Sequence, residues 1–172
     1  MYQTYLITGA TGFLGRAVLQ LLLAHSCRVL ALVMDKDPLA YTIPENVTVF
    51  CGDLTDKDTL RSFFAAGGDS FCVLHCAGLV SIASTPDEAI SRVNVQGTQN
   101  IIALCWEFGA GRLIYVSSVH AIAEKPAPQT ITEPNCFSPD DILGDYGKSK
   151  AMATALDLKA AQSGLNASVV LP

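Results

Sequence analysis

Short apolar runs alternate with longer segments that repeat apolar residues at helical spacing along most of the chain. Near-continuous apolar runs are typical of buried parallel strands, and longer amphipathic segments are typical of helices. Strands are predicted at residues 4–8, 28–34, 47–51, 71–75, 113–117 and 167–171. Helices are predicted at residues 13–25, 57–66, 86–108 and 145–163.

This alternation predicts an α/β fold of the Rossmann type, in which helices cover both faces of a doubly wound parallel sheet of about six strands. No internal repeat or linker-like change of composition divides the chain, so residues 1–172 are predicted to form one dinucleotide-binding domain. Thr85, Pro86 and Glu88 supply an N-cap, an N1 proline and an early acid for the third helix. The connection over 119–144 is unusually long, and long loops at strand ends usually serve ligands.

Composition narrows the function classes. Half of the 172 residues are hydrophobic, which excludes a disordered chain, and a net charge of -5 without a basic run argues against nucleic-acid binding. No apolar stretch approaches the roughly 20 residues needed to cross a bilayer. Six scattered cysteines without a Cys-x-x-Cys pair are typical of reduced thiols, so a cytoplasmic location is predicted. No metal site is expected, because strand alternation separates neighbours such as Cys72, His75 and Cys76.

A glycine-rich turn joins the first predicted strand to the first predicted helix. Gly9 permits the tight turn, Gly12 lets a pyrophosphate approach the backbone, and Gly15 lets the helix pack close to the strand. The helix N-terminus then faces the anion. This context predicts a dinucleotide site.

The choice between NAD and NADP should depend on the residues after the second strand. Asp35 stands twenty positions beyond Gly15, where an acid would bond the ribose 2'-hydroxyl. Lys36 and Arg16 would equally meet a 2'-phosphate. The cofactor is therefore predicted only as NAD(P).

Several further segments, read with the glycine turn, resemble the extended short-chain dehydrogenase/reductase family, to which NAD-dependent epimerases and dehydratases belong. The resembling segments, in chain order, are 8–15, 52–56, 75–78, 93–98, 115–118 and 146–150. After the serine pair Ser117 and Ser118 the chain reads Val-His-Ala-Ile-Ala, which looks closer to the hydroxysteroid dehydrogenase and dihydroflavonol reductase branches than to the sugar-nucleotide branch.

The resemblance implies a set of site residues. It implies that the catalytic groups are Ser118, Tyr146, Lys150 and Asn94. It implies that the cofactor contacts, besides the region of Asp35 and Lys36, are Gly9, Thr11, Gly12, Phe13, Leu14, Gly15, Asp53, Leu54, Cys76, Ala77, Gly78, Ser117, Tyr146 and Lys150.

Physical reasoning supports the last pair independently. Tyr146 and Lys150 are four residues apart on a predicted helix and therefore share one face. A nearby ammonium would favour the phenolate and make proton transfer feasible. Ser118 is the preferred partner for the substrate oxygen, with Ser117 as the second choice. His120 would titrate near neutrality and is a weaker candidate for the substrate pocket.

Three functions follow from this reading. The first is an NAD(P)-dependent oxidoreductase that transfers a hydride between the nicotinamide and a secondary alcohol or ketone, a small-molecule substrate. The second is a nucleotide-sugar epimerase or dehydratase, and the third is a non-catalytic NAD(P)-binding regulator. By resemblance, a substrate-binding region is expected beyond residue 172, so the chain is predicted to be a fragment with reduced or no turnover. A homodimer is expected through helices 86–108 and 145–163.

Overall fold

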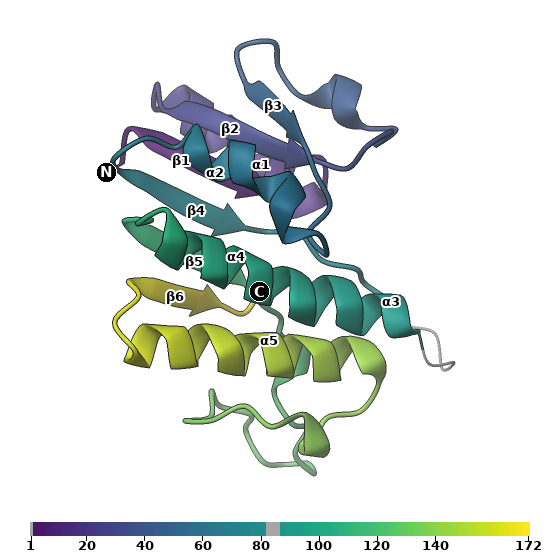
Figure 1. Cartoon of the computed structure of the whole chain (residues 1–172). Helices are drawn as coiled ribbons and strands as arrows, with labels where there is room; N and C mark the ends of the chain where they lie inside the picture. The colour runs from purple at the N-terminus through teal and green to yellow at the C-terminus, as the bar shows by residue number, and fades with distance from the viewer. Residues whose placement is uncertain (1, 82–86) are drawn as a thin grey trace.

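The computed structural model describes residues 2–81 and 87–172. Six parallel strands form one sheet in the order β3-β2-β1-β4-β5-β6, which confirms the predicted doubly wound fold (Figure 1). The strands are β1 Thr4–Thr8, β2 Arg28–Val33, β3 Thr48–Cys51, β4 Phe71–His75, β5 Arg112–Val116 and β6 Ala167–Val170. The helices are α1 Phe13–Ala24, α2 Arg61–Ala65, α3 Glu88–Ser91, α4 Gly97–Glu107 and α5 Asp145–Gln162.

Two predicted helices are subdivided in the structure. The second begins as a 3₁₀ turn, η2 Lys57–Leu60, before α2. The third consists of α3 and α4 with a π-helical segment, η3 Arg92–Gln96, between them. The carboxylate of Asp87 caps α3 by accepting from the Ala89 N–H. The predicted start at Thr85 and Pro86 lies outside the described residues.

Strand alternation sends apolar side chains to both faces of the sheet, so the core has two layers. One layer packs strand residues such as Leu6, Leu30 and Val73 against α2, α4 and α5. The other packs Ile7 and Ala31 against α1. Figure 1 shows α1 behind the sheet and α4 and α5 in front of it. Burial on both faces explains why the central strands are almost wholly apolar.

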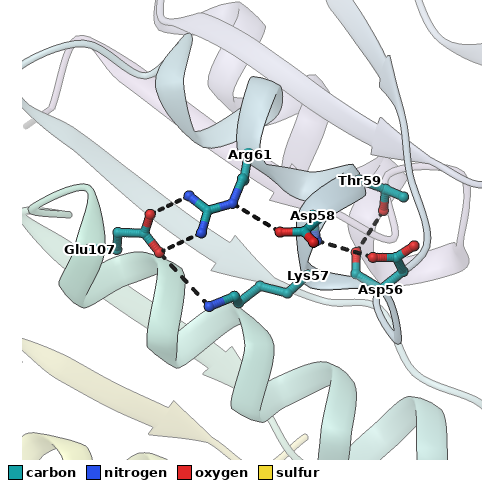
Figure 2. A network of polar contacts seen from close by, with 6 residues as sticks. All are labelled: Asp56, Lys57, Asp58, Thr59, Arg61 and Glu107. Carbon is teal, nitrogen blue, oxygen red and sulfur yellow. Dashed lines mark hydrogen bonds and ion pairs between the residues drawn. The ribbon is translucent and has the colours of Figure 1, made fainter.

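A polar network ties the η2 turn to α4 on the surface (Figure 2). Arg61 donates to both carboxylate oxygens of Glu107 and also pairs with Asp58, while Lys57 lies 3.9 Å from Glu107. Asp56 caps η2 by accepting from the Asp58 N–H. The acids at this turn therefore serve as caps and ion-pair partners.

The sheet order reverses between β1 and β4, which are neighbours although they are far apart in sequence. In their register, Thr8 lies opposite His75 at the carboxyl ends of the two strands. Parallel sheets bind ligands at this switch point, because the connections leave it in opposite directions. In the described part of the chain no helix is long and apolar enough to span a membrane.

Candidate active site

A groove of about 250 Å³ lies over the carboxyl ends of β1, β2 and β4. Its walls come from the glycine turn, the ends of β2 and β3, and the turn after β4. The predicted cofactor contacts that line it are Gly9, Thr11, Gly12, Asp53, Leu54, Cys76, Ala77 and Gly78. Tertiary structure thus brings together motifs from three parts of the sequence.

The glycine turn has the geometry that an anion site requires. Gly9 has a φ of 71°, and a Cβ there would lie 2.7 Å from the Ala77 nitrogen. A Cβ on Gly15 would lie 2.0 Å from the Gly9 carbonyl oxygen, so only glycine lets α1 pack this closely. No side chain caps α1 and no acid stands in its first turn. Its free N–H groups and positive dipole end therefore suit a phosphate.

The β2 end of the groove contains an acid that sequence spacing did not select. Asp37 lines the groove and is half-buried, and its carboxylate accepts a 2.8 Å hydrogen bond from the Thr11 hydroxyl. Asp35 and Lys36 do not line it, and their side chains are 82% and 91% exposed. Lys36 has a φ of 59°, and the turn there carries the chain back so that Asp37 reaches the groove.

Tyr146 and Lys150 lie near the start of α5, beside the end of β5. Lys150 is 4% exposed, donates a 2.8 Å hydrogen bond to the Val116 carbonyl, and holds its Nζ 4.9 Å from the centroid of the Tyr115 ring. Burial lowers the pKa of Lys150 to about 8. Tyr146 is half-buried, and its ring meets that of His120 edge to face at 6.0 Å.

The two serines after β5 have different partners. Ser117 shares a 2.6 Å hydrogen bond with the Thr154 hydroxyl of α5, so it joins β5 to the helix that carries Lys150. The Ser118 hydroxyl accepts from the His120 N–H at 3.2 Å, which leaves its own proton available. Ser118 therefore retains a donor for a substrate oxygen, whereas its role in catalysis stays a prediction.

Asn94 is buried in the π-helical segment, and its side chain forms three hydrogen bonds. The carboxamide accepts from the Leu79 N–H at 2.7 Å, and it donates to the Leu79 carbonyl and the Ser149 hydroxyl at 2.9 Å each. Asn94 thus joins the turn after β4 to α5. π-Helical turns are rare and often occur at functional sites.

The groove and helix α5 meet at Gly78. A Cβ on Gly78 would lie 3.3 Å from Nζ of Lys150 and 3.2 Å from the Asn94 side-chain oxygen. The ammonium of Lys150 therefore lies next to the groove wall, where even a methyl group on Gly78 would crowd it. Phe13, Leu14 and Gly15 stand at the mouth of α1, and Phe13 is 96% exposed.

A second cavity of about 580 Å³ lies between the η4 turn Val119–Ala121 and the long connection over 119–144. His120 both lines this cavity and contacts Tyr146. The rest of the lining is largely apolar, with three carboxylates, and contains no lysine or arginine among the described residues. It comprises Val119, Ile122, Glu124, Ile131, Thr132, Glu133, Asp141, Ile142, Leu143 and Leu171.

Sequence reasoning missed several groups that the structure adds to the site. Asp37 stands two residues past the spacing expected for an acid. Thr154 and Ser149 share α5 with the Tyr-x-x-x-Lys pair, and helical spacing alone would have placed Thr154 on the same face as Lys150. His75 begins the segment 75–78 that resembles the family, but sequence reasoning gave it no role of its own.

The sheet order, together with a glycine turn and a Tyr-x-x-x-Lys pair on α5, is typical of one class of protein. This class is the extended short-chain dehydrogenases/reductases. Within that class, the chain belongs to the 3-beta hydroxysteroid dehydrogenase/isomerase family, whose model matches residues 6–170.

Individual relatives agree with this assignment. The chain is 34% identical over 165 residues to 3 beta-hydroxysteroid dehydrogenase type 7 of Rattus norvegicus, covering 91% of this chain and 48% of that protein. It is 33% identical over 177 residues to a putative dihydroflavonol 4-reductase of Synechocystis, covering 100% and 49%. It resembles the structure of Thermus thermophilus UDP-glucose 4-epimerase in complex with NAD, with a TM-score of 0.77 and 25% identity over 98% and 54% of the two chains. The chain spans about half the length of the curated relatives it matches.

Proposed function

We propose that this chain provides the dinucleotide-binding part of an NAD-dependent oxidoreductase that interconverts a secondary alcohol and a ketone. Membership of an oxidoreductase family supports the general chemistry. The observation that carries the proposal for this chain is the approach of Gly78, in the groove wall, to the Lys150 ammonium. This closeness supports a single site formed by the groove and the Tyr-x-x-x-Lys helix.

Each residue of the proposed site has its own role in the reaction. A bound nicotinamide dinucleotide would supply or accept the hydride. Tyr146 would donate or accept the proton at the substrate oxygen, and Ser118 would orient that oxygen by a hydrogen bond. The buried ammonium of Lys150 would favour the phenolate form of Tyr146 through its positive charge. Asn94 would hold the groove wall against α5 through Leu79 and Ser149.

The acid at the β2 end of the groove favours NAD over NADP. Asp37 lines the groove and Thr11 orients its carboxylate, where an acid can accept from a ribose 2'-hydroxyl and repel a 2'-phosphate. The basic residues Lys36 and Arg16 are exposed and do not line the groove.

The cavity beside Tyr146 favours an apolar, uncharged substrate. Its aliphatic lining buries apolar surface, whereas Glu124, Glu133 and Asp141 would repel a diphosphate. Nucleotide-sugar epimerisation is the second candidate, and the likeness to the epimerase structure supports it. The described lining contains no cation that would pair with a nucleotide-sugar pyrophosphate.

A turnover assay separates the candidates. The chain is mixed with NADH and a panel of apolar ketones, or with NAD and the matching alcohols, and nicotinamide absorbance is followed. Nucleotide sugars are tested in parallel by product analysis, and dinucleotide binding is measured by calorimetry. Oxidoreductase function predicts ketone-dependent oxidation of NADH that Tyr146→Phe abolishes while NADH binding persists.

Other outcomes select the alternatives. Conversion of nucleotide sugars without net change of absorbance would select the epimerase. Dinucleotide binding without turnover of any substrate is expected both of a non-catalytic regulator and of a nucleotide-binding part alone, so it would contradict catalysis by this chain by itself but not its cofactor-binding role. Turnover that survives Tyr146→Phe would contradict the proposed role of the phenol.

We also propose that the protein forms a homodimer through α4 and α5. Most apolar residues of these helices, such as Ile101 and Leu104, pack into the core of the chain itself. The exposed apolar side chains left for a partner include Met152 and Trp106, which are 39% and 49% exposed. Light scattering of the wild type and of Met152→Glu tests the assembly, since the carboxylate should shift a dimer to the monomer.

A further inference from the structure

His75 ends β4 beneath the nucleotide groove and is not used by the proposed chemistry. The side chain is 1% exposed, and both ring nitrogens have hydroxyl partners. Nδ1 lies 2.8 Å from the Thr8 hydroxyl on β1, and Nε2 lies 3.1 Å from the Thr98 hydroxyl on α4. The ring also stacks on Tyr115 of β5, with centroids 5.4 Å apart. One side chain therefore connects three strands and a helix.

The donor and the acceptor of each hydrogen bond in this series can be assigned. The Thr98 hydroxyl donates its single proton to the Asn94 carbonyl at 2.6 Å, because a carbonyl can only accept. The Thr98 oxygen must then accept from Nε2, which therefore carries a hydrogen. Burial and the nearby charge of Lys150 lower the pKa of His75 to about 3, so the ring is neutral. Nδ1 is consequently an acceptor.

The other end is determined in the same way. Since Nδ1 accepts, the Thr8 hydroxyl donates to it. The Thr8 oxygen accepts from the Ala77 N–H at 3.2 Å, because an amide can only donate. The result is one directed series of hydrogen bonds that starts at Ala77 in the groove wall, passes through Thr8, His75 and Thr98, and ends at the Asn94 carbonyl.

Both ends of this series hold the same short turn. Ala77 is held by Thr8, whereas Leu79, two residues on, is held at its N–H and its carbonyl by the Asn94 side chain. Ala77, Gly78 and Leu79 line the nucleotide groove, and Asn94 also contacts Ser149 of the catalytic helix. His75 is the link between the two anchors of this turn.

We propose that His75 is a positioning residue, locked as the neutral Nε2–H tautomer, that couples the groove wall at Ala77–Leu79 to Asn94 and through it to α5. The effect on nucleotide affinity rests on the proposed function, whereas the tautomer and the rigidity of the turn do not. Such a residue makes the groove wall more rigid, because directed buried hydrogen bonds fix the groups they join.

The tautomer is tested by ¹⁵N NMR of the imidazole in the intact chain. The expected spectrum has a protonated Nε2 and an unprotonated Nδ1, unchanged between about pH 5 and pH 9, while an exposed histidine titrates near its usual pKa of about 6.5. A proton on Nδ1, or titration of His75 in this range, would overturn the proposal.

The coupling is tested by His75→Leu, which removes both the acceptor and the donor. Amide hydrogen exchange at Leu79 should become about tenfold faster, and the dinucleotide Kd should rise by about the same factor, as expected from losing one buried hydrogen-bonded link. His75→Gln retains an acceptor and a donor and should recover part of both effects. The matched control is Val73→Ala, at a fully buried position on the same strand. At comparable loss of stability it should leave Leu79 exchange and the Kd unchanged.

Thr98→Val removes only the hydroxyl that accepts from Nε2, so it replaces His75→Leu if that variant fails to fold. Leu79 exchange that stays at the wild-type rate, in whichever of the two variants folds, would overturn the coupling. Absence of dinucleotide binding by the wild type would contradict the proposed function, whereas the tautomer and the exchange rates would still decide the role of His75.

Discussion

Lys150 holds its ammonium 4.9 Å from the centroid of the Tyr115 ring, within the range of a cation–π contact. The same ring stacks on His75, so the lysine and the neutral imidazole share one aromatic neighbour. Lys150 also donates to the Val116 carbonyl, one residue further along β5. The strand β5, which the serine pair follows, therefore also positions Lys150 of α5.

The buried lysine predicts a pH dependence of stability. Burial lowers the pKa of Lys150 to about 8 from an ordinary 10.5, so the folded chain binds this proton less tightly than the unfolded chain. The destabilisation is present in full below pH 8 and is relieved as the pH rises to 10.5. Relative to Lys150→Met, the wild type should gain on the order of 1–3 kcal/mol in free energy of unfolding across this range.

Urea unfolding of both proteins at pH 8 and pH 10 measures this difference, and other titrating groups cancel between the two. A parallel change with pH in wild type and variant would contradict the prediction. Lys150→Met should also lower any ketone turnover by about 10²–10⁴-fold, the usual contribution of assisted proton transfer.

Asp37 should decide the cofactor preference. Asp37→Ser removes the carboxylate that lines the groove, so affinity for NAD should fall and affinity for NADP should rise, with the preference shifting by about 10–100-fold. Titration calorimetry with both dinucleotides measures the two Kd values. Asp35→Ser is the matched control, because its side chain is 82% exposed and lies outside the lining. An equal shift in both variants would show that the effect is only long-range charge.

Asp157 on α5 predicts a second, opposite pH dependence. Its carboxylate is fully buried, neither oxygen has a hydrogen-bond partner among the described residues, and burial raises its pKa to about 7. Its neighbours Cys105 of α4 and Tyr115 of β5 stay uncharged in this range, because burial raises both of their pKa values. The folded chain therefore binds the proton more tightly than the unfolded chain, and stability falls as the pH rises from 3.8 to 7.

Asp157→Asn places a neutral amide in this position. The variant should exceed the wild type by about 2–4 kcal/mol in free energy of unfolding at pH 8 and should match it near pH 4. Denaturant unfolding at the two pH values tests the prediction. A variant that is less stable than wild type at pH 8 would indicate that the carboxylate has a stabilising partner.

Alanine substitutions at two glycines of the same turn should have different effects, one on stability and one on dinucleotide affinity. In Gly15→Ala the new Cβ would collide with the Gly9 carbonyl, so α1 must move and stability should fall by about 3 kcal/mol or more. In Gly12→Ala the nearest atom is 3.3 Å away and the φ of -75° suits alanine, so the fold should persist while dinucleotide affinity falls. Thermal unfolding and calorimetry on both variants test this contrast. Equal losses of stability would contradict it.

The sequence predicted the elements of this protein well because each depends on local pattern. The strand predicted at 71–75 matches β4, and the helix predicted at 145–163 ends at Gln162. The π-helical segment around Asn94 was not predicted, because its sequence continues the apolar spacing of an ordinary helix. Asp37 was missed because its place depends on the backbone turn at Lys36, where φ is positive in a residue other than glycine.

Apolar periodicity, the three spaced glycines and the Tyr-x-x-x-Lys spacing by themselves determined the order of strands and helices along the chain, the tight glycine turn before α1 and the presence of Tyr146 and Lys150 one turn apart on one helix. These properties depend on residues close together in the chain. Only the tertiary structure decided that Asp37 lines the groove, that Gly78 reaches Lys150, and that His75 joins Thr8 to Thr98. Those relationships join residues that lie far apart in the sequence, and only the packing of the sheet and its helices brings such residues close together.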